Sequence, residues 1–280
     1  MKKIFFLLLF ILVGCGHKAE TTTTISETTT SSTAEIIKKS SIPTLFIHGY
    51  SGGPQTFGTL IERMEKNDLA KKEMTITVKS DGSIQADGQL SGQANNPMIQ
   101  VLFEDNESHE WNQAAWIRAT LAYLHDTYAI KNVHLVGHSM GGASSLRYLG
   151  TYGADDSLPQ VNKFSAIGAP FNEFIDTSQT QSIDELLANG PTEFSARYND
   201  YATTLPTAPK CEIQLLVGQL STEEVNDGIV PISSGLSIYH LLQENNYHVS
   251  SHIIKTNAQH SQLHENEEVD ALLQAFLWDK

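Results

Sequence analysis

One ten-residue stretch, VHLVGHSMGG at residues 133–142, decides which fold this chain is expected to adopt. Its apolar start is typical of a buried strand, and residues 142–148 favour a helix. Between them, residues 137–141 match Gly-x-Ser-x-Gly, a sharp turn that lifts a serine hydroxyl clear of the sheet. The small flanking residues let the strand and the helix approach closely. Ser139 is therefore a candidate nucleophile; the alternative is a glycine-rich connection in which a serine caps a helix.

Strand and helix patterns alternate on both sides of this turn. Such alternation predicts an α/β fold with a mainly parallel sheet and helices on both faces. Alternating apolar residues around the Asp81-Gly82 turn predict an added β-hairpin at residues 74–86. The helix expected from Trp111 to Tyr128 carries aromatics that should face the sheet. The other predicted strands are 43–47, 98–103, 133–136, 164–167, 212–217 and 250–254, and the other helices are 54–67 and 269–277.

A long polar segment, residues 171–210, interrupts the alternation. It contains two weak helical patterns, at 183–188 and 193–201. Insertions of this length are usually functional or disordered. We interpret the segment as a small cap over the site, and an extra surface subdomain is the alternative.

The first fifteen residues are typical of an export signal. Lys2 and Lys3 precede an apolar run at residues 4–13, which is too short to cross a bilayer. Leu-Val-Gly-Cys at residues 12–15 is similar to a bacterial lipobox, so Cys15 is the predicted lipidation site. A lipid anchor would hold the exported protein at the outer face of the cell membrane. A plain secretory signal with a chance cysteine is the alternative.

Residues 16–40 are dominated by threonine and serine, and such a segment cannot bury enough apolar surface to fold. We expect a disordered tether, followed by one folded domain at residues 41–280. If Cys15 is acylated, Cys211 is the only other cysteine, and no internal disulfide can form. The formal net charge of -14 argues against nucleic acid as a partner.

A nucleophilic serine needs a base to take its proton and an acid to orient that base, here expected in the chain order serine, acid, histidine. Asp227 follows a predicted strand and is the candidate acid; a simple Asp-Gly turn is the alternative. His260 and His264 both follow the last predicted strand. His260 is favoured because it lies on the loop that leaves the strand, and His264 is an alternative base or a supporting residue. The pair lacks the glutamate of His-Glu-x-x-His, so a metal site is not expected.

The tetrahedral intermediate of acyl transfer needs backbone amides aimed at its oxyanion. The amide of Met140, directly after the nucleophile, is one candidate donor. The glycine-rich loop at residues 48–53 allows close backbone approach, and the amide of Tyr50 is the second candidate. His48 is interpreted as a brace for this loop.

Four motifs together resemble the α/β-hydrolase superfamily. They are HGYSGG at 48–53, GHSMGG at 137–142, NDGIVP at 226–231 and HSQLHEN at 260–266. More narrowly, the chain is similar to lipase-like cell-surface hydrolases of Gram-positive bacteria, a family of largely unknown function. The resemblance implies an α/β-hydrolase fold and a triad of Ser139, Asp227 and His260, with the amides of Tyr50 and Met140 as the oxyanion hole.

The resulting expectation is a lipid-anchored serine hydrolase that cleaves carboxylic esters through an acyl-enzyme, without metal or cofactor. Its substrate would be a small-molecule or lipid ester. Two alternatives use the same sequence features. One is an acyltransferase acting on cell-envelope alcohols, and the other is a surface lipoprotein that binds a ligand without catalysis.

Overall fold

The computed structural model of the protein describes residues 37–278. The predicted signal, the lipidation site at Cys15 and the tether up to residue 36 lie outside the described residues. Within residues 37–278, no helix is both long enough and apolar enough to span a bilayer.

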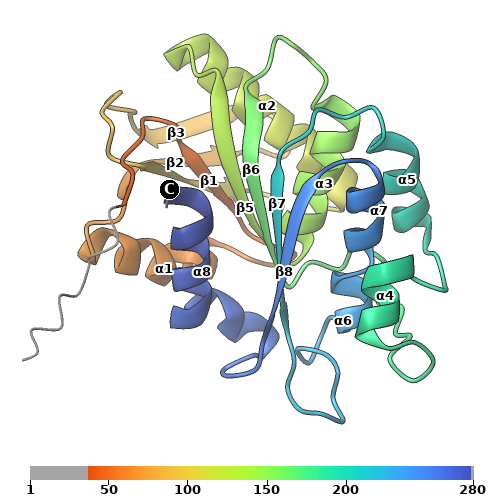
Figure 1. Cartoon of the computed structure of the whole chain (residues 1–280). Helices are drawn as coiled ribbons and strands as arrows, with labels where there is room; N and C mark the ends of the chain where they lie inside the picture. The colour runs from red at the N-terminus through yellow and green to blue at the C-terminus, as the bar shows by residue number, and fades with distance from the viewer. Residues whose placement is uncertain (1–36, 279–280) are drawn as a thin grey trace, which may run out of the picture. The chain divides into compact units, whose positions relative to one another are not determined.

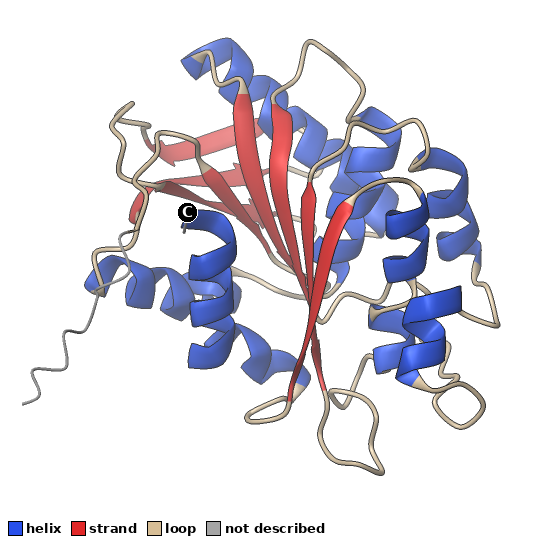
Figure 2. Cartoon of the chain, viewed as in Figure 1, coloured by secondary structure: helices blue, strands red, loops and turns tan. Residues whose placement is uncertain are grey.

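The described residues form one eight-stranded sheet (Figure 2). Its strands are β1 Thr44–Ile47, β2 Lys71–Val78, β3 Ile84–Gly88, β4 Pro97–Phe103, β5 Asn132–His138, β6 Gln160–Ile167, β7 Glu212–Gly218 and β8 His248–Ile254. Their order across the sheet is β3-β2-β4-β1-β5-β6-β7-β8. All neighbouring strands are parallel except β2 and β3, which form the predicted hairpin.

Helices cover both faces of this sheet (Figure 1). They are α1 Pro54–Lys66, α2 Glu110–Tyr128, α3 Met140–Tyr152, α4 Ile183–Asn189, α5 Ala196–Thr204, α6 Ile232–Gly235, α7 Ile238–Glu244 and α8 Glu267–Trp278, with a 3-10 helix, η1, at His260–Glu265. Helices α1 and α8 lie on one face, and α2, α3, α5 and α7 lie on the other. The expected fold class, a mainly parallel sheet between two helical layers, is therefore confirmed.

The central strands are apolar at nearly every position because both of their faces are buried. In β1, Phe46 packs in the cluster beneath α1 and α8, while Leu45 and Ile47 pack in the cluster beneath α2 and α3. In β5, Val136 packs in the cluster beneath α1 and α8, and Leu135 packs in the cluster beneath α2 and α3. A continuous apolar run is the pattern expected for strands covered by helices on both sides.

Parallel strands need crossover connections, and two of these come from segments with weak patterns. Within the predicted cap segment, α5 packs against α3, where the Tyr201 hydroxyl donates to the Ala143 carbonyl at 2.9 Å. This makes α5 the crossover between β6 and β7. Sequence patterns do not predict α6 and α7, which connect β7 to β8 and are only four and seven residues long. Helices this short carry too few apolar repeats to be recognised.

One aromatic residue is not where the sequence analysis places it. Trp111, expected to face the sheet, is 47% exposed at the start of α2. The Arg147 guanidinium lies 3.7 Å from the centre of its indole ring. The expectation is wrong because the buried face of α2 begins with Glu110, Gln113 and Ala114, and Trp111 lies to one side of that face.

Candidate active site

Ser139 lies at a sharp turn between β5 and α3. Its backbone has φ +54° and ψ -125°, a conformation that is strained for any residue with a side chain, typically by about 1–3 kcal/mol. The Ser139 amide donates to the Ile167 carbonyl of β6 at 2.8 Å, and its own carbonyl accepts from the amides of Gly142 and Ala143. These bonds hold the turn between the sheet and the first turn of α3.

Glycines make this turn possible by allowing close backbone contacts. A Cβ on Gly137 would lie 2.6 Å from the carbonyl carbon of Gly141, and one on Gly141 would overlap the carbonyl oxygens of Ile47 and His48. A Cβ on Gly49 would lie 2.8 Å from the Cβ of Ser139. The 48–53 loop therefore lies directly against the nucleophile turn, as its glycine content predicts.

Asp227 and His260 are in direct contact. The Asp227 Oδ2 lies 2.7 Å from the His260 Nδ1, and Oδ1 accepts from the amides of Ile229 and Val230 at 2.9 and 2.7 Å. The Asp227 side chain is 1% exposed. Because a carboxylate only accepts hydrogen bonds, Nδ1 of His260 carries the proton and Nε2 is left as the basic nitrogen.

Ser139 and the pair of Asp227 and His260 lie at the same end of the sheet, where strands β5, β6 and β7 end. Ile167, which accepts from the Ser139 amide, is followed by Gly168. A Cβ on Gly168 would lie 3.1 Å from the Asp227 Oδ2 and 3.2 Å from the His260 Nδ1. Within residues 37–278, the Ser139 hydroxyl makes no hydrogen bond, so its bond to His260 is not formed here. Such bonds are often long in unliganded enzymes and tighten when substrate binds.

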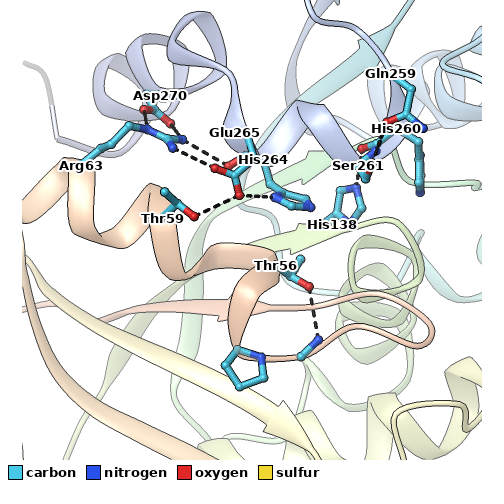
Figure 3. Close-up of polar contacts among 12 residues, drawn as sticks. Thr56, Thr59, Arg63, His138, Gln259, His260, Ser261, His264, Glu265 and Asp270 are labelled. Carbon is cyan, nitrogen blue, oxygen red and sulfur yellow. Dashed lines mark hydrogen bonds and ion pairs between the residues drawn. The ribbon is translucent and has the colours of Figure 1, made fainter.

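His264 has different partners. Its Nδ1 lies 3.1 Å from Glu265, whose carboxylate also binds Arg63, as Figure 3 shows. Burial is the main cause that lowers the pKa of His264. The structure thus brings His260 to Asp227 and places His264 in a separate polar network one turn of η1 later.

The two candidate oxyanion donors are the backbone amides of Tyr50 and Met140. Neither the Tyr50 amide nor the Met140 amide donates to another residue in the described part of the chain. A Cβ on Gly49, the residue before Tyr50, would lie 3.3 Å from the Met140 nitrogen, so the loop that carries Tyr50 lies beside the Met140 amide.

His48 braces the loop that carries Tyr50. Its Nε2 accepts from the Phe103 amide at 3.0 Å, so Nδ1 carries the proton and donates to the Gly49 carbonyl at 2.7 Å. Burial lowers the pKa of His48, which keeps this donor-acceptor arrangement in the neutral imidazole.

One residue of the site has no role in the sequence analysis. His138 is buried directly before Ser139, and its ring centre lies 4.7 Å from that of His260 and 4.9 Å from that of His264. Figure 3 shows His138 between the two later histidines. A histidine at the variable position of Gly-x-Ser-x-Gly is a visible signal, but the motif alone does not indicate what it contacts.

No group of three or more His, Cys, Asp or Glu side chains in residues 37–278 is arranged to hold a metal ion. The remaining cysteine, Cys211, directly precedes β7 and so lies at the end of that strand away from Asp227. It is a buried free thiol, and burial raises its pKa to about 12.

These features define an α/β hydrolase. The chain belongs to the family described as alpha/beta hydrolase of unknown function (DUF915), which it matches over residues 31–280. Among curated proteins, none matches the chain.

Solved structures show the same fold. The product of gene lin2722 from Listeria innocua is 26% identical, with a TM-score of 0.76 over 84% of this chain and 93% of its own. A candidate cell-surface hydrolase from Lactobacillus plantarum WCFS1 is 21% identical, with a TM-score of 0.69 over 84% and 91%. The esterase Pf2001 from Pyrococcus furiosus is 13% identical, with a TM-score of 0.52 over 87% and 90%.

Proposed function

We propose that the protein is a serine hydrolase that cleaves carboxylic esters through an acyl-enzyme. The observation that carries the proposal is the 2.7 Å contact between Oδ2 of Asp227 and Nδ1 of His260. It lies at the end of the sheet where Ser139 occupies its strained turn. An ordinary Asp-Gly turn would need no imidazole partner, and an ordinary glycine-rich connection would need no positive φ at a serine.

The proposed mechanism assigns one role to each group. Ser139 attacks the ester carbonyl while Nε2 of His260 takes its proton, and Asp227 stabilises the imidazolium that forms. The amides of Met140 and Tyr50 bind the oxyanion, a contribution of about 3–4 kcal/mol for each donor. His260 then protonates the leaving alcohol, and a water molecule activated by the same histidine releases the acid.

Fluorophosphonate labelling of Ser139, combined with turnover of a short-chain aryl ester, tests this proposal. Wild-type protein should be labelled at Ser139, and Ser139→Ala should lose labelling and on the order of 10⁵–10⁶-fold in kcat. The Ser261→Ala variant is the matched control, since Ser261 is an exposed serine beside His260, and it should still be labelled. Absence of labelling in folded wild-type protein would contradict the proposal and favour a ligand-binding role.

We also propose that Cys15 carries a lipid that holds the enzyme at the outer face of the cell membrane. The lipobox-like sequence supports this, and the Lactobacillus plantarum relative is described as a candidate cell-surface hydrolase. Cys15→Ser should abolish incorporation of a labelled fatty acid and release the protein from the membrane fraction. Unchanged incorporation would contradict the assignment of Cys15.

A further inference from the structure

We propose that His138 is a positioning residue that holds His260 in place through a hydrogen bond to its backbone carbonyl. The inference rests on the proposed function, in which His260 is the base, and adds a residue to that mechanism. Nε2 of His138 lies 3.0 Å from the carbonyl oxygen of His260. Because a carbonyl only accepts, Nε2 carries the proton and donates it.

Asp227 holds both the backbone and the side chain of His260. The His260 amide donates to the Asp227 carbonyl at 2.8 Å, and the side chains of the same two residues meet at 2.7 Å. Both contacts run toward the loop after β7. The bond from His138 ties His260 to the last residue of β5, which directly precedes Ser139. His138 therefore couples the base to the nucleophile turn, while Asp227 couples the base to the acid.

The imidazole of His138 is itself closely confined. The residue is 6% exposed, with the ring of His260 tilted by 45° on one side and the ring of His264 nearly perpendicular, at 87°, on another. The pKa of His138 lies well below its usual value, mainly because the side chain is buried and also because His260 and His264 lie nearby. A neutral ring with one fixed proton is a directional donor, whereas a charged ring beside His260 would oppose formation of its imidazolium.

Two substitutions separate the hydrogen bond from the packing. His138→Gln keeps an N–H at nearly the reach of Nε2 but loses the ring, and His138→Phe keeps the ring but loses the donor. If His138 positions the base, His138→Phe should lose about 10- to 100-fold in kcat with KM changed less than about threefold, since misplacing a catalytic group has effects of this size. His138→Gln should recover most of that loss. Equal losses in both variants, or full activity of folded His138→Phe, would overturn the proposal.

A measurement on the unmodified protein completes the test. In protein labelled with ¹⁵N-histidine, the nitrogen chemical shifts of His138 should identify a neutral ring protonated at Nε2 at pH 7. A proton on Nδ1 would overturn the proposal even if both variants fail to fold. This readout does not depend on catalysis, so wild-type protein that shows the expected tautomer but no fluorophosphonate labelling would refute the proposed function and leave the hydrogen bond established.

Discussion

Asp227 holds His260 with one carboxylate oxygen and its own loop with the other. Two backbone amides bind Oδ1, so Oδ2 is directed at the imidazole without freedom to rotate. The acid thus fixes both the orientation of the ring and the nitrogen that carries its proton.

Replacing this acid tests its role at the residue scale. Asp227→Asn should lower kcat for an aryl ester by about 10⁴-fold, because an amide donor at this position favours the wrong tautomer of His260. His264→Ala is the control and should lose far less, since His264 contacts Glu265 rather than Asp227. A larger loss in His264→Ala than in His260→Ala would instead make His264 the base.

At the scale of elements, the strand-turn-helix unit of β5 and α3 depends on contact with the loop after β1. That contact leaves no room for a side chain at Gly49, because its Cβ would lie 2.8 Å from the Ser139 Cβ and 3.0 Å from the His138 carbonyl oxygen. The turn at Ser139 and the loop at residues 48–53 therefore form one unit.

Two glycine substitutions test this contact. The one on the loop should lower activity, and the one in the helix after it should raise stability. Gly49→Ala should lose about 100-fold or more in kcat, because the loop must move away from Ser139. Gly58→Ala in α1, where an added Cβ meets nothing within 4 Å, should raise the free energy of unfolding by about 0.5–1 kcal/mol. Steady-state kinetics and thermal unfolding measure the two effects. Unchanged turnover in Gly49→Ala would contradict the proposed contact.

At the scale of the whole molecule, a buried ion cluster joins three helices beside the site. Glu110 of α2 binds both Arg147 of α3 and Arg197 of α5, and Arg197 also donates to the Pro170 carbonyl. Arg147 also reaches Asp200 at the surface. The cluster fastens the segment predicted to be a cap to the main helical layer.

Removing the central carboxylate should destabilise the protein strongly. Glu110→Gln leaves the buried guanidinium of Arg147 and the partly buried one of Arg197 without their common partner, and such losses typically amount to about 3–5 kcal/mol. Urea unfolding measures the change. The control is Arg118→Gln, which removes the exposed pair with Asp155 and should change stability by less than about 1 kcal/mol. Equal effects would show that the buried cluster contributes no more than a surface pair.

Buried histidines should make the whole fold sensitive to mild acid. Burial lowers the pKa of His134 to about 4 from its usual 6.5, and it lowers the pKa values of His48 and His138 as well. Above pH 6.5 these rings are neutral in both the folded and unfolded states. As the pH falls below 6.5, the unfolded chain binds protons that the folded protein does not, so the free energy of unfolding decreases.

His134 lies near the start of β5, whereas Ser139 follows the end of that strand, so His134 can be replaced without changing a residue of the site. The lowered pKa of His134 corresponds to a loss of about 3 kcal/mol in the free energy of unfolding as the pH falls from 6.5 to 4. Replacing it with Gln should make the decline of unfolding free energy over this interval shallower, by up to about 1.4 kcal/mol per pH unit. Urea unfolding at several pH values measures the slope. An unchanged slope would show that His134 does not titrate in this interval.

The features that arise locally could be predicted from the amino-acid sequence. Apolar runs identified the strands flanked by helices, and the Asp81-Gly82 turn identified the hairpin, because strand burial and turn chemistry are properties of neighbouring residues. The glycines around Ser139 predicted a tight turn for the same reason. The helices α6 and α7 are too short to show an apolar pattern, so they could not be predicted. The exposure of Trp111 could not be predicted either, because it depends on which face of α2 packs against the sheet.

Which histidine contacts Asp227, and what His138 contacts, is set by how distant segments pack together. His260 and His264 lie four residues apart after the same strand, and the sequence favours His260 only by its place on the loop that leaves that strand. The choice between them depends on how the loop after β7 lies against the start of η1, a contact between segments 33 residues apart. The bond from His138 to His260 spans 122 residues, and contacts at that separation depend on the order of strands in the sheet rather than on any local pattern.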